Sequence, residues 1–292
     1  MTSDSSLTRF IFDQLPIRGE FTHIGQAWRD ILGKHNYPPP LKNMLGELVA
    51  AGALIAAMIN PKSALTLQIQ GSGAISLLVV ECTGALKIRA TAKWNGEIPH
   101  ANPAELIGEG SFVITLDARD GSHPYQGIVP LEGDSVAAML ENYMTRSEQI
   151  ETRLKLAADD ACACGMLLQK LPEQESPDED AWNRANHLAA TLTRPELLQL
   201  PAMELLHRLY HQENIRVFDA QEIAFECRCS RESVTNILRM LGHDEVRDII
   251  KEQGRVEFLC EFCNERYVFD PVDAEQVFVT TAQQAPASGV KH

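Results

Sequence analysis

Four of the seven cysteines in this chain of 292 residues fall in two close pairs near its C-terminus. Cys227 and Cys229 form a C-x-C pair, and Cys260 and Cys263 form a C-x-x-C pair after residues 230–259. This segment of about 40 residues contains only a handful of apolar side chains, which are too few to stabilise a fold of that size. Four thiolates on one ion would supply the missing stabilisation by closing a long loop, so the spacing predicts one tetrahedral zinc site.

The spacing within each pair also predicts that the site reacts with oxidants. Zinc keeps cysteines as thiolates, and a sulfenic acid formed on one of them has a second cysteine two or three residues away. Structural zinc sites in small peptides contribute about 10 to 16 kcal/mol of apparent binding energy, so we expect oxidation to release the metal and unfold this segment. Two simpler interpretations stay open, a purely structural zinc site and four small packed side chains. His243 is an alternative ligand in place of one thiol.

Two helices and a hairpin are predicted around these cysteines. The first helix begins after Ser230, a favourable N-cap, and stops at Gly242, with apolar residues at helical spacing between them. The second helix covers 244–253. Alternating apolar residues on both sides of CEFC predict a zinc knuckle in a small β-hairpin over 255–270.

The N-terminal part predicts an α+β protein, with a mixed α/β domain over 1–171 that has an antiparallel-rich sheet. A buried helix is expected at 43–59 and an antiparallel meander at 64–94. The Gly-Ser-Gly of 71–73 predicts a turn and not a phosphate-binding loop, because the remaining glycine spacing is missing. Further elements are expected as strands at 111–117, 125–131, 152–158 and 166–171 and as a helix at 134–150.

Composition changes at Pro172, where five acidic residues fall within 173–180. Beyond this run, short helices with thin apolar stripes are expected over 181–213, and isolated helices of this length are marginal in water. We expect them to pack on the zinc-binding segment and to loosen when it unfolds. The sequence therefore predicts a helical linker at 172–226 and a small C-terminal four-cysteine zinc domain at 227–292.

The charge and the hydropathy pattern exclude two classes of partner. A net charge of −14 and an isoelectric point near 5.1 argue against a nucleic acid, because phosphate neutralisation needs a surplus of Lys and Arg. The N-terminus has no long apolar run, and the longest mainly apolar segment, 45–59, falls short of the roughly 20 residues of a bilayer crossing. We therefore expect a cytoplasmic protein without a membrane partner, whose paired cysteines are metal ligands or redox groups.

Two other functions compete with the redox-sensitive zinc site. A zinc-dependent nucleic-acid-binding protein would use the helix pair at 230–250, but from 227 to 255 there are six Lys and Arg against five Asp and Glu. A thiol-disulfide oxidoreductase would use CEFC, although that motif belongs at the start of a helix in a βαβ unit. No Ser/His/Asp arrangement or nucleotide loop stands out, so we do not expect an enzyme.

FECRCS at 225–230 and CEFC at 260–263, with a helical pair between them, resemble the redox-switch domain of the heat shock protein 33 family of bacterial holdase chaperones. Further segments resemble that family's N-terminal domain in the same order. They are IRGEF (17–21), HNYPPPLKNMLGELVAA (35–51), LQIQGSGAISLLVVEC (67–82), RSEQIETRL (146–154) and GMLLQKLP (165–172). The resemblance covers nearly the whole chain.

The resemblance implies a redox-regulated, ATP-independent molecular chaperone that is inactive when reduced and zinc-bound. Its Zn²⁺ ligands would be Cys227, Cys229, Cys260 and Cys263. Oxidants would activate it by forming disulfides within the C-x-C and within the C-x-x-C pair, with zinc release and unfolding of the linker. The resemblance also implies unfolded or partly folded client proteins and a homodimer in the oxidised state. It offers no client-binding motif that can be transferred residue by residue.

A second C-x-C does not follow from the family pattern. Cys162 and Cys164 stand just before the last expected strand of the first domain, and residues two apart in a strand share a face. They are therefore either adjacent thiols able to oxidise or, as is more typical of such cysteines, small packed side chains. Cys82, at the end of an apolar strand, has the same two interpretations.

Overall fold

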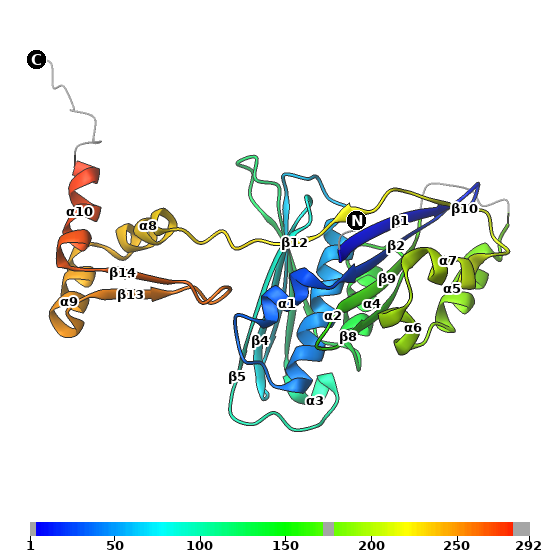
Figure 1. Cartoon of the computed structure of the whole chain (residues 1–292), viewed down its shortest axis with the longest axis horizontal. Helices are drawn as coiled ribbons and strands as arrows, with labels where there is room; N and C mark the ends of the chain where they lie inside the picture. Colours follow the sequence, from blue (N-terminus) through cyan, green and yellow to red (C-terminus); the bar gives the residue numbers. More distant parts are fainter. Residues whose placement is uncertain (1–3, 172–177, 283–292) are drawn as a thin grey trace, which may run out of the picture. The chain divides into compact units, whose positions relative to one another are not determined.

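The computed structural model describes residues 4–171 and 178–282 (Figure 1). The chain divides into two compact units, Met1–Glu226 and Cys227–His292. Residues 172–177 of the acidic run and residues 283–292 of the expected zinc domain lie outside the described residues. The boundary expected between residues 171 and 172 stays a prediction.

The first unit contains two sheets with helices around and between them. Its elements are β1 (Ser5–Phe12), β2 (Ile17–Ile24), α1 (Gln26–Leu32), α2 (Pro39–Ala56), β3 (Ala64–Gly71), β4 (Ile75–Thr83), β5 (Lys87–Trp94), α3 (Pro103–Ile107), β6 (Gly110–Asp117), β7 (Tyr125–Pro130), α4 (Val136–Arg146), β8 (Thr152–Ala158), β9 (Ala163–Lys170), α5 (Ala181–Ala190), α6 (Arg194–Gln199), α7 (Ala202–Tyr210), β10 (Ile215–Val217), β11 (Gln221–Glu222) and β12 (Ala224–Phe225). The first sheet has the strand order β10-β1-β2-β9-β8, with β11 also paired to β1, and the second sheet has the order β12-β5-β4-β3-β6-β7. All of these pairs are antiparallel except β12 with β5.

Helix α2 forms the centre of the main core. It contacts strands of both sheets and lies between them in Figure 1. Leu45, Leu48 and Leu54 have no exposed surface, and small residues such as Gly46 and Gly52 let neighbouring side chains approach the helix closely. A helix that is apolar on nearly every side is stable only when it is enclosed in this way.

Most elements expected in the first unit are confirmed. The helix expected at 43–59 is α2, which begins earlier because Pro39 and Pro40 occupy the first helical positions, where proline needs no hydrogen-bond partner. The meander is β3 to β5, and the strands expected at 111–117, 125–131 and 152–158 are β6, β7 and β8. The prediction of a helix at 134–150 is wrong at the C-terminal end. Helix α4 stops at Arg146, and Gln149 has a left-handed φ of 56°.

Strands β1 and β2 were not predicted from the sequence. Their buried positions include polar side chains, Ser5, Thr8, Glu20 and Thr22, which interrupt the alternation of apolar and polar residues. The strand expected at 166–171 is β9, which already begins at Ala163. Cys164 therefore lies inside the strand and not before it.

The linker helices, α5 to α7, pack on the first sheet. Their buried residues, which include Trp182, Ala185, Leu206 and Tyr210, share a second core with Phe10 and other side chains of that sheet. The first sheet is therefore the partner of these helices within the first unit, and the expected packing on the zinc-binding segment stays a prediction. Apolar spacing shows that a helix needs a partner but does not say which partner it has.

The second unit is small and contains α8 (Arg231–Leu241), α9 (His243–Gln253), β13 (Val256–Leu259), β14 (Arg266–Phe269) and α10 (Pro271–Ala282). The two expected helices and the expected hairpin are confirmed, and α10 was not predicted. Among the described residues, the buried apolar core of this unit consists of Val234, Leu238, Val246, Val256, Phe269, Ala274 and Val277. The core is as small as the sequence indicates.

No helix within residues 4–171 and 178–282 is long and apolar enough to cross a membrane.

Candidate metal centre

The C-x-C pair lies in the extended segment between β12 and α8. Cys229 directly precedes Ser230, whose hydroxyl accepts a hydrogen bond from the backbone N–H of Ser233 at 3.0 Å and so begins α8. This cap satisfies one of the free N–H groups at the helix start. It also fixes the chain direction immediately after Cys229.

The C-x-x-C pair lies in the turn between β13 and β14. The N–H of Cys260 donates to the carbonyl of Glu265 at 2.9 Å, and the N–H of Asn264 donates to the carbonyl of Cys260 at 2.8 Å. Asn264 has a φ of 61°, a conformation that asparagine tolerates better than most residues. The turn therefore closes tightly around Cys260, which is buried.

The four sulfurs converge in a single cluster, which we call the four-cysteine cluster (Cys227, Cys229, Cys260 and Cys263). The Sγ–Sγ distances are 3.4 Å from Cys227 to Cys229, 3.7 Å from Cys227 to Cys260 and 3.3 Å from Cys229 to Cys263. All four sulfurs lie within 4.8 Å of one another. Around an ion with metal–sulfur bonds of about 2.3 Å, the tetrahedral edge is roughly 3.8 Å, so these separations fit one shared metal ion.

Electrostatics favours a cation at this cluster. Burial raises the pKa of Cys227, but hydrogen bonds from the Cys229 backbone and from neighbouring cysteines outweigh that effect and lower the pKa to about 7. Burial raises the pKa of both Cys229 and Cys263. Neighbouring thiolates repel one another, so a positive charge is needed for all four to be deprotonated together.

One side chain outside the cluster supports a negative sulfur. The hydroxyl of Tyr267 donates to the Sγ of Cys229 at 3.3 Å, and this bond raises the pKa of the phenol. Partners of this kind orient metal ligands and tune them. Tyr267 was not predicted as a site residue, although its place opposite Phe258 in the hairpin puts it near the cysteines.

His243 does not belong to the cluster. Its Nε2 pairs with a carboxylate oxygen of Glu275 at 2.9 Å, and its ring packs against Phe278. The structure therefore excludes His243 as a replacement for one of the thiols.

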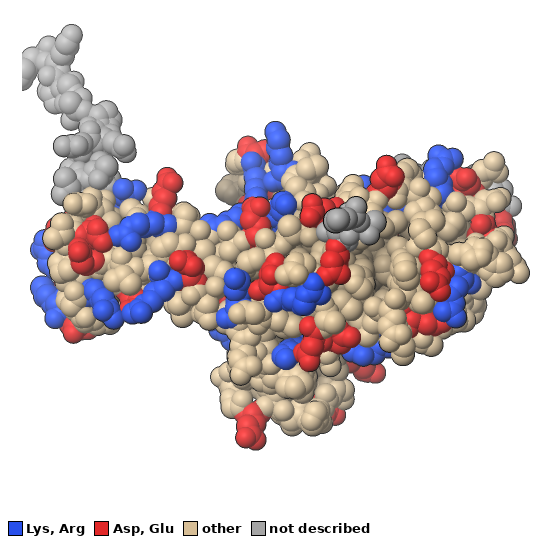
Figure 2. Space-filling view, viewed as in Figure 1, with Lys and Arg blue, Asp and Glu red and all other residues tan. Residues whose placement is uncertain are grey.

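The structure gives no support to the two alternative functions. CEFC lies between two strands, so no helix N-terminus lowers the pKa of its first cysteine. Figure 2 shows basic and acidic side chains intermixed on the face in view. In the second unit, basic side chains pair with acidic ones in Arg231–Asp273, Arg247–Glu275, Lys251–Asp248, Arg255–Glu257 and Arg266–Glu257.

The remaining three cysteines are in the first unit and are buried. Cys82 is 1% exposed in β4, and burial raises its pKa, as expected for a packed side chain. The sulfurs of Cys162 and Cys164 are 3.7 Å apart, and Nδ1 of His23 is 3.2 Å from the Sγ of Cys164. The proximity of His23 to these cysteines was not predicted from the sequence.

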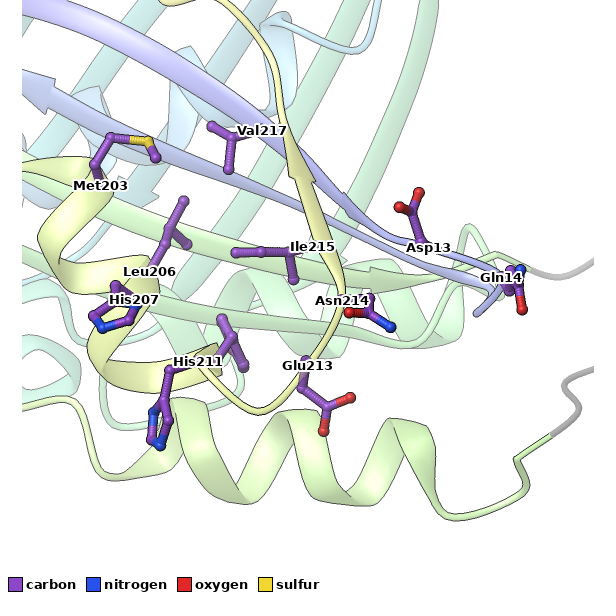
Figure 3. A pocket seen from close by; sticks show the side chains of 11 residues that line it. Asp13, Gln14, Met203, Leu206, His207, His211, Glu213, Asn214, Ile215 and Val217 are labelled. Carbon is purple, nitrogen blue, oxygen red and sulfur yellow. The ribbon is translucent and has the colours of Figure 1, made fainter.

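A hollow of about 500 Å³ adjoins the linker helices, between α7, β10 and the turn after β1 (Figure 3). Leu206 on α7 and Ile215 on β10 line it, and Met203 at the start of α7 is 60% exposed. Leu205, Leu206, Leu209 and Tyr210 of α7 are buried, so Met203 is an exposed apolar side chain at the edge of an otherwise covered helix face.

Comparisons with known proteins find similarity to the same kind of protein over nearly the whole chain. The family described as Hsp33 protein matches residues 5–270. A 33 kDa chaperonin of Methylobacillus flagellatus is 51% identical over 294 residues, with 100% of both chains covered, and one of Chromobacterium violaceum is 49% identical with 95% of each covered. The crystal structure of the 33 kDa chaperonin from Thermotoga maritima shares the fold, with a TM-score of 0.83, 23% identity, and 96% of this chain and 99% of that chain covered.

Proposed function

This chain belongs to the Hsp33 protein family, and on that premise we propose that it is a redox-regulated, ATP-independent holdase chaperone. In the reduced chain the four-cysteine cluster holds Zn²⁺, and client proteins are not bound. Oxidation forms a disulfide within each pair, releases the metal and unfolds the linker. The observation that carries this proposal is the convergence of four sulfurs in a unit whose own core is very small.

Zinc, when bound, supplies the positive charge that keeps neighbouring sulfurs deprotonated, and it adds about 10 to 16 kcal/mol of apparent binding energy in small peptides. The chain's own residues position the ligands. Ser230 caps the helix beside Cys229, Asn264 closes the turn after Cys263, and Tyr267 donates a hydrogen bond to the Cys229 sulfur.

The oxidation is a two-electron step at each pair, with peroxide as the oxidant. One thiolate attacks a peroxide oxygen, which gives a sulfenic acid and hydroxide. The second thiolate of the pair attacks that sulfur and displaces another hydroxide, and two solvent protons convert both hydroxides to water. The products are disulfides between Cys227 and Cys229 and between Cys260 and Cys263, which no longer offer four thiolates to a metal.

Short strands, backbone hydrogen bonds and the buried side chain of Ile223 attach the chain that leads into the cluster to the first unit. The N–H of Ala224 donates to Leu86 at 3.1 Å, and the N–H of Glu226 donates to Ile88 at 3.0 Å. Two-residue strands such as β12 and β11 contribute little stability of their own. Unfolding of the second unit therefore exposes the end of the linker to fraying toward α7.

Detachment of the linker helices would expose the surface that we propose binds clients. On the first sheet, Phe10 and Phe12 pack against the ring of Tyr210, with centroids 6.0 Å and 5.0 Å apart. Met166 and Leu168 extend the same buried surface. An apolar surface of this kind binds the exposed apolar segments of unfolding proteins without sequence specificity.

The remaining parts of the proposal follow the family. We infer that the oxidised chain forms a homodimer, that the protein works in the cytoplasm, and that neither nucleic acid nor membrane is a partner. It is not proposed to be an enzyme.

The test compares reduced, zinc-loaded chain with chain treated with peroxide under mild heat. Each form is added to a client diluted out of guanidinium, and light scattering reports aggregation while zinc content and free thiols are measured. We expect only the oxidised form to suppress aggregation, with loss of zinc and of four thiols. A reduced, zinc-loaded form that suppresses aggregation equally well would refute the regulation.

Cys82→Ala provides the matched control, because this buried cysteine lies outside the four-cysteine cluster. It should switch as the unaltered chain does. A variant with Cys227→Ser and Cys229→Ser should lose zinc without oxidant and suppress aggregation in the reduced state.

A further inference from the structure

A second cluster of metal-binding side chains lies in the first unit, which we call the thiol-imidazole cluster (His23, Cys162 and Cys164). His23 on β2 is the direct cross-strand partner of Cys164 on β9, so both side chains lie on one face of the first sheet. Cys162 stands two residues before Cys164 and shares that face. Strand register therefore brings together residues that are far apart in the sequence.

The geometry of this cluster matches that of the four-cysteine cluster. The Sγ–Sγ distance is 3.7 Å, the distance from the Cys164 sulfur to Nδ1 of His23 is 3.2 Å, and all three ligand atoms lie within 4.8 Å of one another. Around zinc, with bonds of about 2.3 Å to sulfur and about 2.0 Å to nitrogen, the corresponding tetrahedral edges are roughly 3.8 Å and 3.6 Å. The remaining separation, from the Cys162 sulfur to a ring nitrogen of His23, is at most 4.8 Å, so rotation of the imidazole or of the Cys162 side chain would place all three atoms on one ion.

Within residues 4–171 and 178–282, these are the two places where three or more His, Cys, Asp or Glu side chains meet this closely. Cys82 shows what a packed cysteine looks like in the same unit. Its sulfur contacts the carbonyl of Thr83 at 3.5 Å and belongs to neither cluster. Burial alone therefore does not bring an imidazole nitrogen to a thiol.

The backbone holds Cys162 in place through a tight turn. A carboxylate oxygen of Asp159 accepts from the N–H groups of Ala161 at 2.8 Å and Cys162 at 2.9 Å, and the N–H of Asp159 donates to the carbonyl of Cys162 at 2.9 Å. The indole of Trp28 donates to the carbonyl of Asp159 at 2.7 Å. The turn is thus fixed before any ligand binds, which is what a preorganised site requires.

One member of the cluster borders a hollow. His23 is half-buried and lines a hollow of about 720 Å³, together with Asp4, Gln199 and Glu222. A cation can reach the imidazole through this hollow, whereas Cys162 and Cys164 are buried, so metal binding to the sulfurs requires a local opening of the core that they share with the linker helices. Three protein ligands with one open position are a common zinc arrangement.

We propose that His23, Cys162 and Cys164 form a second metal site, which binds one thiophilic cation of the Zn²⁺ class when the chain is reduced. Binding displaces one proton from each thiol to solvent, and Nδ1 of the neutral imidazole is the third ligand. The site is independent of the chaperone function proposed above. It predicts two metal ions per chain.

The test measures metal stoichiometry in the full-length, reduced chain after it is stripped and reloaded with Zn²⁺ or, as a spectroscopic probe, Co²⁺. We expect two ions per unaltered chain after dialysis and one ion per chain for Cys162→Ala with Cys164→Ala. His23→Gln should also leave one tightly held ion. Cys82→Ala, the matched control, should keep two.

A reciprocal variant separates the two sites. With all four residues of the four-cysteine cluster changed to Ser, the chain should keep one Co²⁺ with a thiolate charge-transfer band of about half the intensity of the other site, because two sulfurs replace four. One ion in the unaltered chain, or two in the Cys162→Ala, Cys164→Ala variant, would overturn the proposal. The result for the unaltered chain does not depend on the folding of any variant.

Discussion

The two units of the chain are stabilised by different means. The first unit encloses α2 between two sheets, with Leu45, Leu48 and Leu54 fully buried. The second unit has few buried apolar residues and four converging sulfurs. Apolar burial contributes free energy that changes little with redox state, whereas a thiolate site contributes free energy that an oxidant removes. In the function proposed above, this difference lets the second unit respond to oxidants while the core around α2 keeps its structure.

The sharpest test of this contrast is metal removal under reducing conditions. A strong chelator should unfold the second unit, because about 10 to 16 kcal/mol of apparent binding energy is lost there, and should leave the core around α2 in the first unit folded. Limited proteolysis should then yield a resistant fragment that contains α2 and ends within the linker at 172–226. Loss of protection around α2, or no loss in the second unit, would contradict the contrast.

A second test separates the two cores inside the first unit. Leu48→Ala in α2 and Leu206→Ala in α7 both truncate buried leucines, and each should cost about 2–5 kcal/mol. Leu48→Ala should lower the free energy of unfolding of the whole unit. Leu206→Ala should instead speed amide hydrogen exchange in α5 to α7 while α2 keeps its protection. Equal effects on both regions would show that the linker helices do not detach separately.

The units should also respond to pH in opposite directions. Burial raises the pKa of Glu20 from 4.5 to about 7, and nearby Arg9 opposes this only in part. Between these values the folded first unit holds a proton that the unfolded chain has released, so its free energy of unfolding falls as pH rises, by on the order of 1–3 kcal/mol. Glu20→Gln should reduce this slope, which denaturant titrations at pH 5 and pH 8 would measure. Burial also raises the pKa of Glu47 to about 7, so the Glu20→Gln variant should keep a smaller fall in the free energy of unfolding as pH rises.

In the second unit the sign is reversed. A hydrogen bond from Arg266 lowers the pKa of Glu257, and one from His243 lowers that of Glu275, so their contribution is lost as pH falls. Protons also compete with a metal ion for the cysteine sulfurs, so acidification weakens metal binding and lowers the stability of the second unit. A second unit that gained stability on acidification would contradict this assignment.

The smallest expected effect is at two equivalent helix caps. Ser230→Ala and Ser135→Ala each remove a hydroxyl that accepts a backbone N–H, at 3.0 Å and 3.2 Å, and each should cost about 1 kcal/mol. Ser230→Ala should also speed metal loss to a chelator, because Ser230 adjoins Cys229. Ser135→Ala should not change that rate, and equal rates in both variants would argue against a positioning role for Ser230.

The sequence predicted those features that depend on local spacing. The cysteine pairs, the helices on either side of Gly242 and the enclosed helix α2 all have short-range patterns. Features set by non-local pairing could not be predicted in this way. His23 lies 141 residues before Cys164 and meets it only through the register of β2 with β9, while the polar residues buried in β1 and β2 hid the strands themselves.

The same pairing has a consequence for biosynthesis. Strand β2 ends at Ile24, but its partner β9 begins at Ala163, and β1 pairs with β10 and β11, which end at Glu222. At about 5–20 residues per second, a ribosome needs on the order of ten seconds to make the intervening chain. During that interval β1 and β2 can pair with each other but lack their outer partner strands, so the nascent chain itself is prone to aggregation until most of the first unit has been synthesised.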